Sequence, residues 1–154
     1  MHLEIIPFRP YLAGYFRDLN LSWLEHYFYV EPKDTELLEN CERSIIEKGG
    51  YIFFAELNSE IVGCFSFIKV DELTFELGKM AVDPKFQGLK IGQKLMEYAI
   101  YFAKKKKWKT LLLYSNTKLE PAIYIYRKYG FEEMELEKNT PYIRSNIKMS
   151  LILD

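Results

Sequence analysis

The chain has 154 residues, enough for one domain, because domains most often contain ~100–150 residues. Its hydrophobic share of 49% and charged share of 28% lie near the globular average and exclude intrinsic disorder. The net charge of −1 argues against a basic nucleic-acid-binding surface or a polybasic membrane patch. No apolar stretch approaches the ~20 residues of a membrane-spanning helix, and the first residues do not open a signal peptide. We therefore expect one soluble, cytoplasmic domain over residues 1–154, without nucleic-acid or membrane partners.

The first third of the chain predicts one strand and two helices. Residues 3–6 form a short apolar strand, which Pro7 and Pro10 stop. Apolar residues then recur at helical spacing over residues 11–26. A second helix follows Pro32, with Asp34 as its N-cap and Gly49-Gly50 as its stop. The apolar residues behind these helices are Leu12, Tyr15, Phe16, Leu19 and Trp23, then Leu37, Leu38, Cys41, Ile45 and Ile46.

The middle of the chain predicts three strands and the strongest helix. Residues 51–57 and 61–70 flank Asn58-Ser59-Glu60, which is typical of a hairpin, and a third strand covers residues 73–82. An amphipathic pattern over residues 91–105 predicts a helix, and Lys104 to Lys107 favour the negative end of its dipole. The two cysteines, Cys41 and Cys64, have neither CxxC spacing nor a nearby histidine pair, so we expect no metal site and no disulfide framework.

The last third predicts a strand over residues 110–114, a helix over residues 121–129 closed by Gly130, and a terminal hairpin. In the tail, Ile143, Ile147, Met149, Leu151 and Leu153 alternate with polar residues, which predicts a strand paired with residues 131–137. The predicted order is βααβββαβαββ, a mixed α/β (α+β) sandwich around one sheet.

The segment from Met80 to Gly92 passes from a strand through a glycine-containing loop into the strongest helix. The start of a helix carries unpaired backbone N–H groups and a positive dipole end, and glycines let a phosphate approach the backbone. The segment therefore indicates an anion-binding loop, although tight packing produces similar turns. It lacks the Gly-Lys-Ser/Thr of a Walker A motif and the dinucleotide-binding fingerprint.

Two motifs resemble signatures of the GCN5-related N-acetyltransferase (GNAT) superfamily. Val82-x-Pro84-x-x-Gln87-Gly88-x-x-Ile91-Gly92 is similar to the Arg/Gln-x-x-Gly-x-Gly/Ala loop that wraps the pyrophosphate of coenzyme A. Ala122-Ile123-x-Ile125-Tyr126-x-Lys128-x-Gly130-Phe131 is similar to the family's Ala-Ile-x-Leu-Tyr-x-Lys-x-Gly-Phe. The resemblance, strongest from Phe75 to Phe131, implies a GNAT-like fold: a mostly antiparallel sheet with splayed central strands flanked by helices. It also implies acetyl transfer from acetyl-CoA to a primary amine of a small molecule or protein, by direct attack in a ternary complex.

The resemblance implies which residues bind acetyl-CoA as the co-substrate. Asn116 matches an asparagine that often hydrogen-bonds the cofactor, and it equally suits a strand-end turn. Lys90 replaces the glycine usual in the middle of the loop; we expect a negative φ there, with the ammonium able to approach a phosphate. The full predicted cofactor-binding set is Met80, Ala81, Val82, Gln87, Gly88, Leu89, Lys90, Ile91, Gly92, Asn116 and Tyr126.

Acetyl transfer needs a deprotonated amine, a polarised thioester carbonyl and a proton for the departing thiolate. Tyr126 matches the family's proton donor, whereas Tyr124 is expected to pack. Glu76 is the candidate base, because period two places it on the strand face of Gly78, Met80 and Val82 unless a bulge shifts the register. Gly78 within this strand is consistent with such a bulge, and equally with a weak spot in the strand. A water chain is the alternative to a dedicated base. His26 is the other natural base, and a lone histidine on a helix face is more often structural.

In the family the acceptor enters between the first helices and the terminal hairpin. This placement nominates Trp23, Tyr27, Tyr29 and Glu31 on one side, with Tyr142 and Arg144 on the other. Aromatic faces and a carboxylate suit a cationic amine, whereas Arg144 suits a carboxylate on the acceptor. The alternative function is a non-catalytic GNAT-fold acyl-CoA sensor. Relatives are often dimers, so a homodimer is compatible with the sequence.

Overall fold

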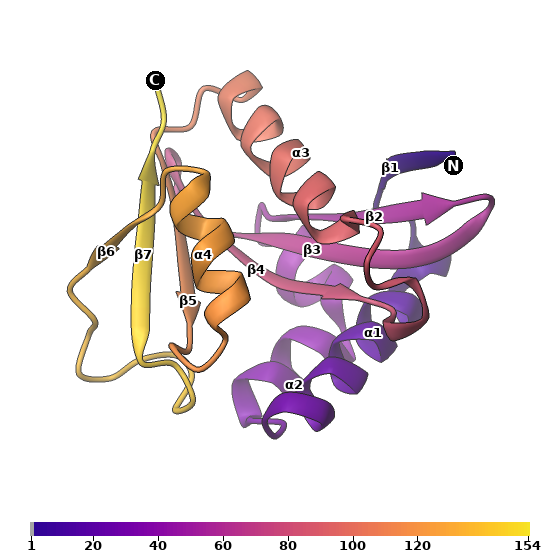
Figure 1. Cartoon of the computed structure of the whole chain (residues 1–154), viewed down its shortest axis with the longest axis horizontal. Helices are drawn as coiled ribbons and strands as arrows, with labels where there is room; N and C mark the ends of the chain where they lie inside the picture. Colours follow the sequence, from indigo (N-terminus) through magenta and orange to yellow (C-terminus); the bar gives the residue numbers. More distant parts are fainter. Residues whose placement is uncertain (1) are drawn as a thin grey trace.

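The computed structural model describes residues 2–154 as one mixed sheet with helices on both faces (Figure 1). The element order matches the predicted βααβββαβαββ. The strands are β1 (Leu3–Pro7), β2 (Tyr51–Leu57), β3 (Glu60–Asp71), β4 (Thr74–Val82), β5 (Thr110–Ser115), β6 (Glu132–Met134) and β7 (Ile147–Ile152). The α-helices are α1 (Ala13–Tyr27), α2 (Pro32–Glu39), α3 (Ile91–Lys105) and α4 (Glu120–Lys128).

The seven strands lie in the order β1-β2-β3-β4-β5-β7-β6. Every neighbouring pair is antiparallel except β4 and β5, which are parallel and are connected through α3. The sheet is therefore mixed and mostly antiparallel, as predicted. In Figure 1, β4 and β5 run together at one end and diverge toward the other.

Each face of the sheet carries its own hydrophobic core. Phe65, Phe67 and Leu111 point toward α3, where they pack with Leu95 and Ala99. On the opposite face, Phe54, Ile52 and Cys64 pack against the buried sides of α1 and α2. Both cores follow from the period-two alternation of the strands and the amphipathic spacing of the helices.

The second helix differs from its prediction in two ways. It begins after Glu31, which is the N-cap, while Asp34 occupies the third position of the first turn. Glu31 and Asp34 form a capping box, in which the Asp34 carboxylate accepts a hydrogen bond from the Glu31 backbone N–H at 2.9 Å. The helix ends at Glu39, and a separate π-helical turn over Glu42–Ile46 continues toward Gly49.

The terminal strand is shorter than its alternating pattern suggested. Ile147 and Met149 are buried on β7, as predicted, whereas Ile143 is 82% exposed in the connection before the strand. The helix after the loop, α3, has the predicted bounds Ile91–Lys105. In the chain from residue 2 onward, no helix is long and apolar enough to cross a bilayer.

Candidate active site

The site is built on a seam between β4 and β5. These strands pair only over Thr74–Glu76 and Thr110–Leu112, although β4 continues to Val82 and β5 to Ser115. Backbone groups beyond the last pair face each other without a common ladder in the described chain. The splayed central strands that the GNAT resemblance implied are therefore present.

A β-bulge in β4 changes which side chains face which core. Cys64 of β3 pairs with Ala81 and Ser66 pairs with Gly78, so Phe65 stands opposite two residues, Lys79 and Met80. The bulge turns Lys79 toward α2 and sends Met80 and Val82 toward the α3 core. Met80 and Val82 therefore do not share a face with Glu76, because the bulge, the exception that the prediction allowed, adds one residue and reverses the alternation.

A cavity of about 240 Å³ passes through this seam. From the α3 side it is lined by Leu77, Met80, Met96 and Leu113, together with Tyr126 of α4. From the α1 and α2 side it is lined by Trp23, Phe28, Glu76, Lys79, Tyr114, Tyr142 and Arg144. The cavity thus has an apolar part on the α3 side of the sheet and a polar part on the α1 and α2 side. The polar part, lined by the second set of residues, is called the polar chamber below.

Glu76 lies in the polar chamber. Its carboxylate lies beside Gly78: a Cβ added to Gly78 would be in ordinary van der Waals contact with the Glu76 Oε2 atom, at 3.6 Å. Burial raises the pKa of Glu76 to about 7, and the positive charge of Lys79 partly opposes this shift. A carboxyl group with a pKa near neutrality is suited to accept and release a proton at physiological pH.

Tyr126 lies on the opposite wall of the same cavity, where α4 faces β5. Its ring contacts Phe131 at a centroid distance of 6.1 Å. Burial raises the pKa of its phenol, with a smaller opposing effect of the Ser115 hydroxyl, so the group carries its proton at neutral pH. Tyr124, two residues earlier, is 69% exposed, so the expectation that it packs is wrong.

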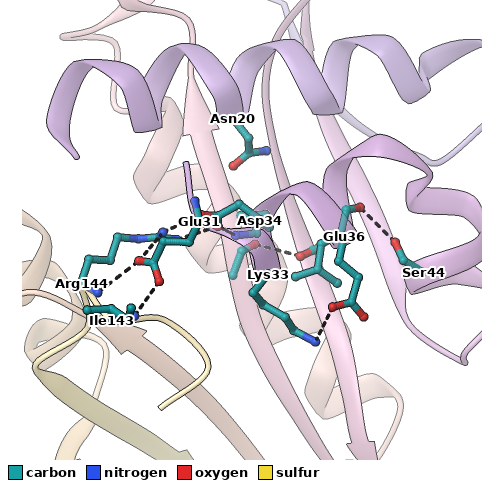
Figure 2. Close-up of polar contacts among 12 residues, drawn as sticks. Asn20, Glu31, Lys33, Asp34, Glu36, Ser44, Ile143 and Arg144 are labelled. Carbon is teal, nitrogen blue, oxygen red and sulfur yellow. Dashed lines mark hydrogen bonds and ion pairs between the residues drawn. The ribbon is translucent and has the colours of Figure 1, made fainter. Parts of the chain in front are cut away.

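Four largely buried charged side chains close the polar chamber at its α2 end. Figure 2 shows three of them, Glu31, Asp34 and Arg144. The Arg144 guanidinium donates to both oxygens of Asp34 at 2.6 and 2.8 Å and to Glu31 Oε2 at 3.1 Å. Glu31 also accepts the backbone N–H groups of Ile143 and Arg144. Lys79 forms an ion pair with Asp34 from the bulge in β4. The cluster Glu31–Asp34–Lys79–Arg144, called the charge quartet below, contains two carboxylates and two cations.

The charge quartet changes the reading of the predicted acceptor residues. Glu31 and Arg144 neutralise each other instead of presenting opposite charges to a substrate. Trp23 and Tyr142 do line the cavity, but Tyr27 and Tyr29 do not, and Tyr29 is 52% exposed. Lys79 and Asp34 had no site role in the sequence prediction. The sequence indicated a possible bulge at Gly78, but it did not show that Lys79 would be the residue that changes face.

Tyr114 connects the chamber to the protein surface. Its hydroxyl donates to Glu137 at 2.5 Å, and Lys148 donates to the other oxygen of that carboxylate at 2.6 Å. The Tyr114 pKa is raised by burial and by the neighbouring Glu137. Sequence reasoning missed this pair, because Glu137 reaches β5 from the irregular connection between β6 and β7.

Asn116 lines the cavity at the end of β5, but its side chain also shapes the chain around it. Its Nδ2 donates to the Arg144 backbone oxygen at 2.8 Å, and its Oδ1 accepts the Lys118 backbone N–H at 2.9 Å. These bonds are those of a strand-end turn residue, one of the two readings that the sequence left open.

The loop before α3 has an open backbone. Gly88 has a φ of +86°, and an added Cβ at Gly88 or Gly92 would meet nothing within 4 Å. The first backbone N–H groups of α3 have no acceptor inside the helix, so they are available to an anion. Lys90 is the N-cap of α3 with φ +59° and ψ +28°, in the left-handed region. The expected negative φ is therefore wrong: Lys90 adopts the conformation for which glycine is favoured.

The remaining predicted loop residues divide by exposure. Leu89 is 40% exposed beside Gly88, whereas Ile91 and Ala81 are buried in the two cores. Val82 and Gln87 line a second cavity of about 610 Å³ beside α1, which also contains His26. Within residues 2–154, no group of three histidine, cysteine or acidic side chains could hold a metal ion.

Comparisons with known proteins agree with this architecture. The family model of the GNAT acetyltransferase domain matches residues 48–133. A Bacillus subtilis protein, named provisionally as a [ribosomal protein bS18]-alanine N-acetyltransferase, is 26% identical over 150 residues, covering 89% of this chain and 91% of that protein. A GNAT-family acetyltransferase structure from Staphylococcus aureus Mu50 has a TM-score of 0.87 and 27% identity, and covers 99% of this chain and 100% of its own. A GNAT-family structure from Elizabethkingia anophelis with acetyl-CoA bound has a TM-score of 0.67 and 24% identity, with 98% of both chains covered.

Proposed function

Since the chain belongs to the GNAT acetyltransferase family, we propose that it transfers the acetyl group of acetyl-CoA to a primary amine by direct attack in a ternary complex. One observation carries this proposal: a single cavity crosses the sheet and is lined from both faces. A thioester entering from the α3 side and an amine entering from the α2 side would meet at the seam.

The loop before α3 suits the diphosphate of acetyl-CoA. Gly88 and Gly92 leave the backbone open at the positive end of the helix dipole. Lys90 adds a flexible ammonium beside that end of the helix, and an ammonium is a strong donor to phosphate oxygens. Met80, on the same side of the sheet as α3, lies where the acyl chain would pass toward the seam.

Two residues on opposite walls carry the proton transfers in this proposal. Glu76 takes a proton from the acceptor ammonium, directly or through water, and leaves a neutral amine whose lone pair attacks the thioester carbonyl carbon. The new C–N bond forms as the C–S bond breaks, and the departing thiolate takes its proton from the Tyr126 hydroxyl. The second proton, which the nitrogen loses as the amide forms, returns to the Tyr126 oxygen directly or through water, and Glu76 releases its proton to solvent. Unpaired backbone N–H groups along the seam are suited to polarise the carbonyl.

The acceptor wall favours an amine without a second fixed charge. Glu31, Asp34, Lys79 and Arg144 are committed to one another, so the wall offers aromatic surface from Trp23, Phe28 and Tyr142 with little net charge. An amine on a small apolar group fits this surface, whether it belongs to a small molecule or to a protein N-terminus. The name of the Bacillus subtilis relative makes a peptide with N-terminal alanine the first acceptor to test.

The first measurement is a thermal shift with acetyl-CoA, CoA and ATP compared side by side. A ligand at a hundred times its Kd adds about 2.7 kcal/mol to the free energy of unfolding, a shift of several degrees for a domain of this size. We expect acetyl-CoA and CoA, but not ATP, to stabilise the protein. No shift with either thioester or thiol would contradict the proposal.

Turnover separates the enzyme from the non-catalytic sensor. Thiol release from acetyl-CoA is measured with a panel of small amines and peptides, including one with N-terminal alanine, in the wild type and in Tyr126→Phe. The enzyme predicts amine-dependent thiol release that falls in the variant. Acetyl-CoA binding with no turnover on any amine would favour the sensor.

A further inference from the structure

Lys79 has an unusual place for a lysine. It lies within a strand, its φ is +52°, and its side chain is 5% exposed. A non-glycine residue in the left-handed region costs of order 1–2 kcal/mol, and a buried ammonium costs more unless it is paired. Such a combination persists where the surrounding structure holds it in place, and it is typical of functional sites.

The β-bulge puts this ammonium on the same face of the sheet as Glu76. Without the extra residue, Lys79 would continue the odd-numbered face of Phe75 and Leu77, which is buried against α3. With it, Lys79 pairs with Asp34 and lies over the Tyr142 ring at 4.5 Å from the centroid. Both Glu76 and Lys79 then line the same chamber.

The Asp34 carboxylate has hydrogen-bond donors other than Lys79. Arg144 already donates to both Asp34 oxygens, and the Asp34 carboxylate also accepts the Glu31 backbone N–H. Both cations lie against the Tyr142 ring, since the Arg144 guanidinium is also 4.5 Å from the ring centroid. Lys79 therefore contributes a cation beyond the one that already binds this carboxylate.

Other charged groups act on Glu76 from the elements packed around it. Lys33 of α2 is 40% exposed, so solvent screens it, and Lys148 of β7 is bound to Glu137. Glu137 is itself a carboxylate, and the Tyr114 and Tyr142 hydroxyls are neutral at physiological pH. Arg144 also lines the chamber, but its guanidinium is bound to Asp34 and Glu31. Of the cations that act on Glu76 in residues 2–154, Lys79 has the largest effect, and it lies in the same chamber.

We propose that Lys79 is a positioning residue for acetyl transfer: its ammonium, fixed by Asp34, is the counter-charge that allows Glu76 to ionise inside the cavity. This inference rests on the proposed role of Glu76 as the base. It also assigns a function to the bulge: the extra residue interrupts the regular strand and turns the Lys79 ammonium to the face of the sheet that carries Glu76.

The test compares Lys79→Met, which removes the charge and keeps the length, with Lys79→Arg, which keeps the charge. Lys33→Met is the matched control, because it removes another cation that acts on Glu76. The Glu76 carboxyl is titrated by carbon NMR in each protein without substrate, and its signal is identified by its loss in Glu76→Gln. The kcat is measured against pH with acetyl-CoA and the best amine of the panel.

In Lys79→Met we expect the Glu76 titration to move up by about one pH unit. The kcat then falls about fivefold at pH 7 and recovers near pH 9, because a smaller fraction of Glu76 is ionised at neutrality. Lys79→Arg and Lys33→Met should stay within about 0.3 pH unit of the wild type. If Lys79→Met does not fold, Lys79→Met combined with Asp34→Asn keeps the quartet neutral and carries the same test.

A folded charge-removing variant whose Glu76 titration and kcat profile stay in place would overturn the proposal, whatever its thermal stability. That result would leave Lys79 with a structural role only. If no amine is acetylated by the wild type, the NMR titration still decides whether Lys79 acts on Glu76, and the missing turnover counts against the proposed function alone.

Discussion

The Arg144 guanidinium binds the Asp34 carboxylate through two hydrogen bonds of 2.6 and 2.8 Å, and the two residues are 110 positions apart in the chain. The Asp34 side chain is fully buried, and Arg144 is 12% exposed. This contact ties the start of α2 to the connection between β6 and β7, the two segments that border the α2 side of the cavity. A bidentate pair of this kind fixes geometry as well as charge.

Asp34→Asn is expected to lower the free energy of unfolding by about 3–5 kcal/mol, because it leaves Arg144 and Lys79 short of a buried counter-charge. Urea denaturation at pH 7 measures this change. Asp18→Asn is the control: Asp18 pairs with Arg17 at the surface, and its loss should cost less than about 1 kcal/mol. Equal losses in the two variants would contradict the assignment.

Acid should remove the Asp34 contribution in a defined direction. Burial alone would raise the pKa of Asp34, but the hydrogen bonds from Arg144 and the charge of Lys79 lower it to about 2. A carboxyl with a lowered folded-state pKa stabilises the fold above its unfolded-state pKa of ~4, and this stability is lost as the pH falls toward 2. Melting temperatures recorded from pH 6 to pH 3 should therefore fall more steeply in the wild type than in Asp34→Asn.

Glu76→Gln should stabilise the protein at pH 8 while reducing its activity. The pKa of Glu76 is raised to about 7, so the folded state is favoured with the proton bound, and this contribution is lost as the pH rises through 7. Glutamine removes that loss, so the melting temperature should rise at pH 8 and change little at pH 5. The kcat should fall roughly 10²-fold. A variant with unchanged kcat would indicate that a water chain serves as the base.

Tyr126→Phe should lower kcat by roughly 10²-fold with little change in acetyl-CoA affinity, because only the proton for the leaving thiolate is lost. Stopped assays of thiol release and calorimetric binding of acetyl-CoA separate the two quantities. Tyr124→Phe, on the exposed side of α4, is the matched control and should behave as the wild type. Similar losses in both variants would argue against a role for the Tyr126 hydroxyl.

Lys90 allows backbone strain and charge to be separated. Lys90→Gly should raise the free energy of unfolding by about 1 kcal/mol, because glycine adopts a φ of +59° freely. Lys90→Met keeps the strain and removes the ammonium, so it should weaken acetyl-CoA binding without stabilising the protein. Lys94→Met, one turn further along α3, controls for the loss of a positive charge. Unchanged affinity in Lys90→Met would mean that the ammonium does not contact the ligand.

The sequence predicted local elements well where one rule dominated. The bounds of α3 followed from its apolar spacing, and the element order followed from turn residues and period-two runs. It failed where long-range contacts decide. Asp34 suits an N-cap by residue type, but it is the third residue of the first turn, where its carboxylate contacts Arg144 and Lys79. Ile143 continues the alternation of the tail, yet the backbone there turns to meet Glu31.

The site shows the same division. The motif residues around Gly88 and Tyr126 carry a local signature, so the sequence could nominate them. The charge quartet has no local signature, because its members come from α2, β4 and the connection before β7. Gly78 indicated a possible bulge. Its effect on Met80, Val82 and Lys79 depends on the register between β3 and β4, which the sequence of β4 alone does not determine.

The seam between β4 and β5 makes the sheet incomplete without a ligand. Only three residue pairs join its two halves directly, so amides past Glu76 and Leu112 that face the gap are open to exchange with solvent hydrogen. A chain-like ligand with amide groups of its own, lying in the gap, would act as a short inserted strand and shield them. A bound ligand would then slow hydrogen exchange along the facing edges of β4 and β5, and it would reduce the motion of the two halves of the sheet relative to each other.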